Sequence, residues 1–217
     1  MPTQASHLPT LLRSPTHPIL LRTLEPRDAA SVSAVLSDPE NTKYDPHASA
    51  VSPEVAVKVI ERMRESASAP TVLDDDDAGL KVVRGPGRVN LLIVYVDGVE
   101  DTLGSTADDG TVIGFGGFGN IQELDEDGEK VRVGDVGAMI NSAFRGRGLA
   151  TEAIRLAVEW AFKGVREGGL QLARVTATMS DKNVAMVGLV EKKLGWTGVR
   201  KPNGEVFFEV TKDTWRK

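Results

Sequence analysis

The chain has 217 residues, of which 41% are hydrophobic and 26% charged, a balance typical of a single globular domain. It contains no cysteine, which excludes disulfides, a thiolate nucleophile and a cysteine metal site, and its three histidines disfavour a zinc enzyme. The net charge of -5 disfavours non-specific nucleic-acid binding, and no apolar run reaches the roughly 20 residues of a membrane helix. We expect a monomer or homodimer without metal, nucleic-acid or membrane partners, in the cytoplasm by default.

Residues 1–18 differ in composition from the rest of the chain. They contain four prolines, no acidic residue and one basic residue, Arg13. Targeting peptides also avoid acidic residues, but these prolines oppose an amphipathic helix. We therefore expect a loosely ordered N-terminal arm over 1–18 and one domain over 19–217.

The hydrophobic pattern beyond the arm predicts strands and helices of a mixed α/β (α+β) fold. Strands are expected at 19–25, 89–96, 111–121, 130–140, 173–179, 197–200 and 206–210, and helices at 28–36, 53–66, 150–165 and 183–194. The runs 125–128 and 202–204 predict hairpin turns. The polar segments 67–88 and 97–110 are expected to be loops.

Two patterns suggest sites for which the context is unfavourable. Residues 114–119 match the Gly-x-Gly-x-x-Gly pattern of dinucleotide-binding proteins, but a charged turn follows instead of the helix that such a site requires. The glycines fit better in a strand that admits a close neighbour. Asp74–Asp77 offers four carboxylates, but adjacent acids point in different directions, which favours a solvated segment over a metal site.

The most informative segment, 141–152, joins a predicted strand to a predicted helix and reads Asn-Ser-Ala-Phe-Arg-Gly-Arg-Gly-Leu-Ala-Thr-Glu. The first amides of a helix lack internal partners, and the helix dipole adds partial positive charge there. Glycines allow a phosphate to approach, and Arg145 and Arg147 add side-chain charge. The absence of Gly-Lys-Ser/Thr excludes a P-loop. This segment is therefore predicted to cradle a phosphate, and a glycine turn that binds nothing is the alternative.

The six residues from Arg145 to Ala150 fit the pattern Arg/Gln-x-x-Gly-x-Gly/Ala. This resembles the pyrophosphate loop of the GNAT superfamily of acyl-CoA-dependent N-acetyltransferases. Further segments resemble strands and a helix start of this superfamily, at 20–28, 112–118 and 135–140. Residues 37–44, and Asn183 followed by Glu-Lys-Lys-Leu-Gly-Trp at 191–196, resemble the branch that acetylates ribosomal-protein N-termini. The resemblance runs from about residue 19 to the end.

The resemblance implies a GNAT fold, with a mostly antiparallel sheet of about seven strands flanked by about four helices. It also implies acetyl-CoA as acyl donor. The residues it assigns to the cofactor are Met139, Ile140 and Asn141 through backbone groups, Arg145, Gly146, Arg147, Gly148, Leu149, Ala150 and Thr151 around the pyrophosphate, and Asn183. Asn183 can equally serve as a helix cap.

Amine acetylation requires the acceptor to lose a proton, and Asp135 is the candidate general base because burial in its strand would raise its pKa. A structural aspartate is the alternative. The family often has a tyrosine acid near the helix at 183–194, but this chain has only Tyr44 and Tyr95. Tyr44 is the first candidate for the general acid, ahead of Ser142 and Ser180, or it only lines the pocket.

These observations predict direct acetyl transfer to a primary amine in a ternary complex, because no cysteine is available for an acyl-enzyme. The acceptor is a protein N-terminus or a small amine. The main alternative is a non-catalytic acyl-CoA-binding module. A further alternative, RNA binding through Arg-Gly-Arg-Gly, is disfavoured by the negative net charge.

Overall fold

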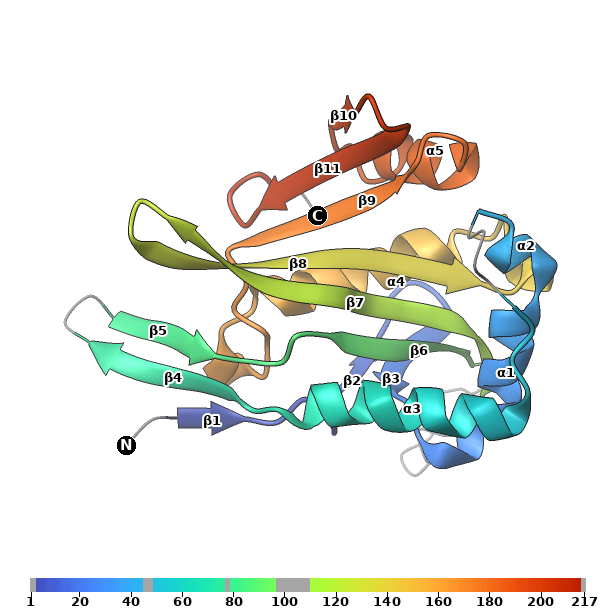
Figure 1. Cartoon of the computed structure of the whole chain (residues 1–217), viewed down its shortest axis with the longest axis horizontal. Coiled ribbons are helices and arrows are strands. Elements are labelled where there is room, and N and C mark those ends of the chain that lie inside the picture. The colour runs from blue at the N-terminus through green and yellow to red at the C-terminus, as the bar shows by residue number, and fades with distance from the viewer. Residues whose placement is uncertain (1–2, 45–48, 77–78, 97–109, 216–217) are drawn as a thin grey trace.

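The computed structural model describes residues 3–44, 49–76, 79–96 and 110–215 (Figure 1). Eight strands form the main sheet, in the spatial order β10-β11-β9-β8-β7-β6-β3-β2. Their bounds are β2 (Leu11–Arg13), β3 (Ile19–Thr23), β6 (Val89–Tyr95), β7 (Thr111–Glu126), β8 (Glu129–Ile140), β9 (Arg174–Ser180), β10 (Gly198–Arg200) and β11 (Glu205–Thr211). Neighbouring strands are antiparallel except β8 and β9, which are parallel.

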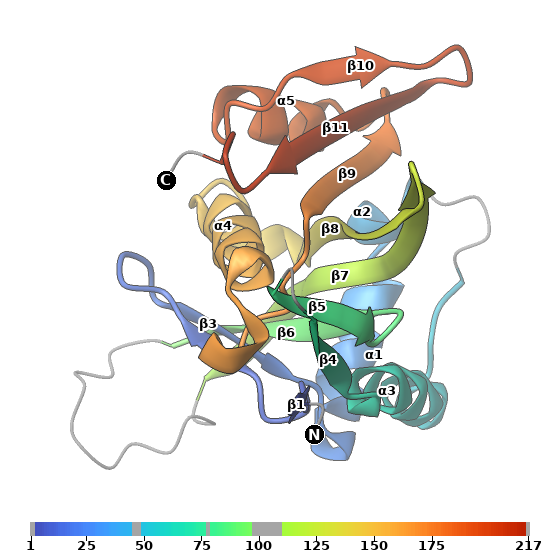
Figure 2. The same ribbon diagram turned by 90° about the vertical axis from the view of Figure 1, so that its left-hand side faces the viewer.

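Helices cover both faces of this sheet, as Figure 2 shows. They are α1 (Ala29–Ser37), α2 (Pro39–Thr42), α3 (Pro53–Ser68), α4 (Leu149–Phe162) and α5 (Val184–Lys192), with short 3-10 turns at η1 (Pro26–Asp28), η2 (Ser142–Phe144) and η3 (Val165–Glu167). Side chains alternate across β6: Leu91 and Ile93 pack into the core beneath α4, whereas Leu92 and Val94 pack into a second core beneath α1 and α3. The predicted mixed α/β fold is thus confirmed, with a layer of helices on each side of the sheet.

The β7–β8 hairpin follows its prediction closely. Asp127 and Gly128 have φ values of 54° and 84°, the left-handed backbone that a tight hairpin turn requires. Residues 114–119 lie within β7, so the Gly-x-Gly-x-x-Gly match belongs to a strand. Any side chain at Gly114 would collide with the backbone of Met139 in β8, which explains the glycine by close packing of two strands.

The expectation of a loosely ordered arm over 1–18 is wrong for the residues that the structure describes. β1 (Thr3–Ala5) pairs with β4, and β2 pairs with β3 at the edge of the main sheet. Leu8 and Leu12 pack against the core beneath α4, and Pro9, Pro15 and Pro18 lie in the turns between strands. The prolines that oppose a helix here shape two turns instead.

The expectation of a loop over 67–88 is also wrong. β4 (Thr71–Asp76) and β5 (Gly79–Arg84) form a hairpin, and with β1 they make a second, three-stranded sheet. Val72 and Leu73 are buried, and Asp74 lies opposite Lys81, so opposite charges face each other across the pair. The predicted loop at 97–110 lies outside the described residues except for Gly110, and so does Asp77.

A buried histidine joins the N-terminal strands to the rest of the fold. His7 is 1% exposed, its Nε2 lies 2.7 Å from the hydroxyl of Thr71, and its ring meets Trp160 of α4 edge to face at 5.7 Å. Burial, assisted by the nearby charge of Arg132, lowers the pKa of His7 to about 4. His7 is therefore neutral in the folded protein at physiological pH.

This buried histidine predicts acid sensitivity of the fold. The unfolded chain binds a proton at His7 near the ordinary pKa of about 6.5, whereas the folded chain binds it only near 4, so protonation favours unfolding in between. The contribution of His7 is present above pH 6.5 and declines by about 2–3 kcal/mol as pH falls to 4. Denaturant unfolding of wild type and His7→Gln between pH 7 and 4 measures it. An identical pH slope in the variant would contradict the assignment.

Candidate functional site

The site is built on the point where β8 and β9 part. Their parallel pairing comprises three residue pairs, from Val133↔Arg174 to Asp135↔Thr176. β8 continues to Ile140 and β9 to Ser180, but no pairing joins them within these described strands beyond Asp135 and Thr176. Figure 1 shows β9 turning away from β8 toward α5. The result is a V between two central strands, open toward the start of α4.

One arm of this V exposes backbone groups. The Asn141 N–H donates to the carbonyl of Ile113 in β7, at 2.8 Å. Because successive backbone groups of a strand point to opposite edges, the N–H and carbonyl of Ile140 face the β9 side, where the strands have separated. The Ile140 carbonyl accepts a hydrogen bond from Nε of Arg145 at 3.0 Å. The Ile140 N–H is thus aimed into the V, whereas that of Asn141 is committed to the sheet.

Asp135 lies at the vertex of the V. Its Oδ1 accepts hydrogen bonds from the hydroxyls of Thr176 and Thr178 on β9, at 2.9 and 3.4 Å. Burial raises the pKa of this carboxyl, and the bonds from the two threonines oppose that rise. The carboxylate is therefore held in place by β9 and is easier to protonate than an exposed aspartate.

The other structural component is the start of α4. Gly148 is the N-cap residue with φ 80°, and Gly146 two residues earlier has φ 77°, so both glycines adopt the left-handed backbone. Among the described residues no side chain caps this helix start, although Leu149 is buried and Ala150 is half-buried. The free amides of the first turn, up to Thr151, therefore remain available to an anion.

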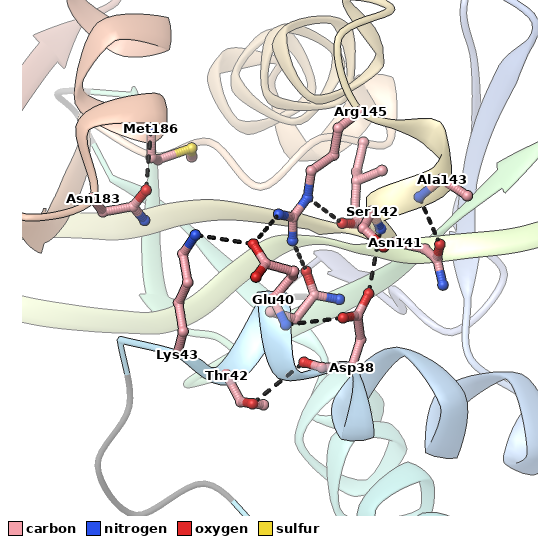
Figure 3. A network of polar contacts seen from close by, with 12 residues as sticks. Asp38, Glu40, Thr42, Lys43, Asn141, Ser142, Ala143, Arg145, Asn183 and Met186 are labelled. Atoms are coloured by element: carbon pink, nitrogen blue, oxygen red, sulfur yellow. Dashed lines mark hydrogen bonds and ion pairs between the residues drawn. The ribbon is translucent and has the colours of Figure 1, made fainter.

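The two arginines of the loop are already engaged. Figure 3 shows Arg145 reaching from the loop toward α2. Its guanidinium donates to the Asn41 side chain at 2.5 Å and lies 3.6 Å from the Glu40 carboxylate. Asp38 accepts from the Ser142 N–H at 3.3 Å, so α2 is fastened to the loop at two points. Arg145 therefore holds α2 against the loop, in addition to contributing positive charge to the site.

Arg147 makes different contacts from Arg145, with residues of its own loop. Its guanidinium carbon lies 5.3 Å above the ring centre of Phe144, and it donates to the Ala143 carbonyl at 3.3 Å. Phe144 in turn contacts Tyr95 of β6 at 5.4 Å between ring centres. Arg147 is exposed, so its charge lies at the surface beside Gly146 and Gly148.

Sequence reasoning missed a buried carboxylate in the first turn of α4. Glu152 is 5% exposed and accepts hydrogen bonds from Ser14 at 2.6 Å and Thr16 at 3.2 Å, and His17 lies 3.8 Å from its second oxygen. These partners come from the turn between β2 and β3, in the segment expected to be a loose arm. The sequence signal was the run Ser14-Pro15-Thr16-His17-Pro18, which by itself indicates no partner.

The other predicted site residues, Asn183, Tyr44 and Ser180, make local contacts of their own. Asn183 caps α5 by accepting from the Met186 N–H at 3.2 Å, which is the structural role left open above. Tyr44 is 40% exposed and lies under Lys43 at 5.1 Å. Within the described residues no hydrogen bond joins Tyr44 to Asp135, so the structure does not bring the two predicted catalytic residues into contact. The Ser180 hydroxyl accepts from the Lys182 N–H at 3.3 Å.

A basic cavity of about 590 Å³ lies further along α4, between Arg155, the end of α5 and the C-terminal residues. Its walls include Lys192, Lys193, Trp196 and Trp215. None of the predicted catalytic or cofactor residues lines it. It is therefore distinct from the V between β8 and β9.

Two further findings concern the described ranges 3–44, 49–76, 79–96 and 110–215. No group of three or more acidic or histidine side chains is placed to hold a metal ion. No helix there is long and apolar enough to cross a membrane.

The parted central strands and the uncapped, glycine-rich helix start form an open strand edge beside an anion-binding helix end, as the resemblance in the sequence implies. A family model described as "Acetyltransferase (GNAT) domain" matches residues 19–197. The chain therefore belongs to the GNAT acetyltransferase family.

Individual relatives are more distant. An 84-residue stretch is 37% identical to an "N-acetyltransferase 9-like protein" of Caenorhabditis briggsae, and it covers 38% of this chain and 39% of that protein. The structure of ribosomal-protein-S5-alanine acetyltransferase from Vibrio fischeri is similar, with a TM-score of 0.64, 15% identity and coverage of 96% and 100%. RimJ of Mycobacterium smegmatis, solved with CoA-disulfide, has a TM-score of 0.62, 16% identity and coverage of 98% and 88%. At these identities the two structures show the fold alone.

The raised pKa of Asp135 predicts that its ionised carboxylate lowers the free energy of unfolding at neutral pH. A carboxyl whose pKa is higher in the folded than in the unfolded state stabilises at low pH, and that contribution is lost as pH rises through the folded pKa. Asp135→Asn keeps an oxygen for Thr176 and Thr178, so we expect its Tm at pH 7 to rise by a few degrees. Thermal unfolding measures this, with the exposed hairpin variant Asp125→Asn as control. A lower Tm would indicate a structural aspartate.

Proposed function

We propose that this protein is an acetyl-CoA-dependent N-acetyltransferase that moves an acetyl group directly to a primary amine in a ternary complex. The observation that carries the proposal is the V between β8 and β9, with a shielded carboxylate at its vertex and an uncapped helix start at its mouth. The family membership and the CoA compound named for the RimJ structure support the same donor.

The start of α4 fits a diphosphate. The first-turn amides offer donors without internal partners, both glycines leave room for close approach, and Arg147 adds charge at the surface. Gly146, Gly148, Leu149, Ala150 and Thr151 would hold the phosphates through their backbone. Arg145 would act chiefly by fixing α2 against the loop, since its guanidinium already contacts Asn41 and Glu40.

The arm of β8 fits the amide-rich part of acetyl-CoA. This substrate supplies an acetyl group on a thioester, and an extended amide chain can pair with an open strand edge. Ile140 is the residue of the predicted trio whose N–H faces the V, so it is the donor that would polarise a carbonyl oxygen there. Met139 shares the orientation of Asn141 by strand alternation, and both serve the sheet.

Asp135 would act as general base. An amine attacks only when neutral, and a carboxylate with a raised pKa accepts its proton more readily than an ordinary aspartate. Thr176 and Thr178 hold the carboxylate, which would take the proton from the acceptor directly or through one intervening water. A protein N-terminus, with a pKa near 7.7–8.0, loses its proton more easily than a lysine near 10.4. Protein N-termini and small amines of low pKa are therefore the acceptor classes that we propose.

The first prediction concerns acetyl-CoA binding. Gly148→Glu places a carboxylate where a phosphate should bind, and it should weaken binding by more than about a hundredfold in calorimetric titration. Gly128→Glu is the matched control, because Gly128 has φ 84°, nothing within 4 Å of its Cβ position, and lies in the β7–β8 turn. Equal binding by both variants would contradict the cradle.

The second prediction concerns turnover. Asp135→Asn should reduce kcat by about 10²–10⁴-fold while the affinity for acetyl-CoA stays within twofold. In wild type, kcat should fall as pH is lowered through the raised pKa of Asp135, because the protonated carboxyl accepts no proton. Thiol release with a panel of peptide N-termini and small amines measures both. Acetyl-CoA binding without turnover on any acceptor would instead indicate a non-catalytic acyl-CoA-binding module.

A further inference from the structure

The turn between β2 and β3, Ser14–Pro18, lies directly against the start of α4. The Nε2 atom of His17 is 3.2 Å from the position that a Cβ atom would take at Gly148, the N-cap residue. This turn lies just before residues 19–197, which the family model matches.

The turn is rigidly built. The Ser14 hydroxyl oxygen accepts from the backbone N–H groups of Thr16 at 3.1 Å and of His17 at 2.9 Å, and it donates to Glu152 at 2.6 Å. The Ile19 N–H donates to the His17 carbonyl at 2.7 Å, where β3 begins. Pro15 and Pro18 restrict the backbone on both sides of the pair Thr16-His17. His17 is thus held in place before any ligand binds.

A buried carboxylate lies next to the phosphate cradle. Glu152, in the first turn of α4, opposes the binding of an anion at the same helix end. The hydroxyls of Ser14 and Thr16 donate to it, and Nδ1 of His17 lies 3.8 Å away. A further donor to the phosphate, beside Arg145 and Arg147 of the preceding loop, would offset this repulsion.

The contacts of the imidazole involve Nδ1 rather than Nε2. Nδ1 lies 2.9 Å from the Thr16 hydroxyl oxygen, which also lies 3.2 Å from the Glu152 carboxylate. A histidine ring whose Nδ1 accepts from a hydroxyl carries its proton on Nε2, and Nε2–H is then a hydrogen-bond donor toward Gly148.

We propose that His17 is a phosphate-binding residue of the acetyl-CoA site, which donates from Nε2–H to the diphosphate at the start of α4. The inference rests on the proposed function, since it assigns a residue to the same ligand. Ser14, Thr16 and Glu152 position the ring beside Gly148. The N-terminal hairpin thereby completes a site whose other contacts come from the loop before α4.

The test uses 3'-dephospho-CoA, which keeps the diphosphate but lacks the 3'-phosphate. In calorimetric titration, His17→Ala should bind this compound about tenfold more weakly than wild type, as expected for loss of one hydrogen bond to a charged group. Acetyl-pantetheine, which lacks phosphate, should bind both proteins equally.

Controls separate the failure modes. Lys130→Ala removes one exposed positive charge at the β7–β8 hairpin and should leave affinity unchanged. His17→Leu, which keeps side-chain volume for use if His17→Ala unfolds, should weaken binding to a similar degree. Wild-type affinity in either His17 variant would overturn this proposal alone, while the cradle tested by Gly148→Glu would still stand. Failure of wild type to bind CoA compounds would overturn both.

Discussion

The brevity of the β8–β9 pairing is the constraint on which the rest of the site depends. Three paired residues suffice to hold two parallel strands in one sheet, and the next residues of both strands then diverge. That divergence frees the edge of β8 at Ile140, leaves Asp135 at the vertex under the hydroxyls of β9, and directs the chain into the loop before α4. A longer ladder would satisfy those backbone groups and close the site.

The divergence is sustained because each side of the V has its own support. α4 packs over the central strands in the core that contains Leu91 and Ile93, and α1 and α3 cover the other face around Leu92 and Val94. α2 is fastened to the loop by Arg145 and Asp38. β9 is held by the complete antiparallel ladder with β11. The open edge of β8 therefore coexists with two well-packed faces.

Local signals predicted the elements that carry the cradle. The strand at 130–140, the glycine loop and the helix near 150 lie next to each other in the sequence, so periodicity and glycine spacing were sufficient. The assignment of Met139, Ile140 and Asn141 to the cofactor came from family resemblance, because no local pattern in β8 shows how many of its residues pair with β9. The role of Arg145 in fastening α2 depends on Asn41, 104 residues away, and was not predictable. Tyr44 remains a candidate without a defined partner in the site.

The two wrong predictions, a loose arm over 1–18 and a loop over 67–88, have the same physical cause. β4 carries acidic residues that resemble a solvated loop, and its strand depends on β1 and on the buried contact between Thr71 and His7. Residues 3–18 look disordered for the same reason, because their partners lie far along the chain. The contact between Glu152 and Ser14 spans 138 residues. Composition reports average polarity, and it says little about a segment whose order comes from a distant partner.

The pairing of β1 with β4 has a consequence for how the molecule acquires its structure. His7 and Thr71 are separated by 64 positions, whereas β2 and β3 form a local hairpin. Closing so long a loop costs chain entropy before its contacts repay it, so the three-stranded sheet should be among the last parts to consolidate. Until it does, β1 and β4 present unpaired edges that can join other chains. The molecule is thus most prone to aggregate during a late step of folding, far from the strands that form its site.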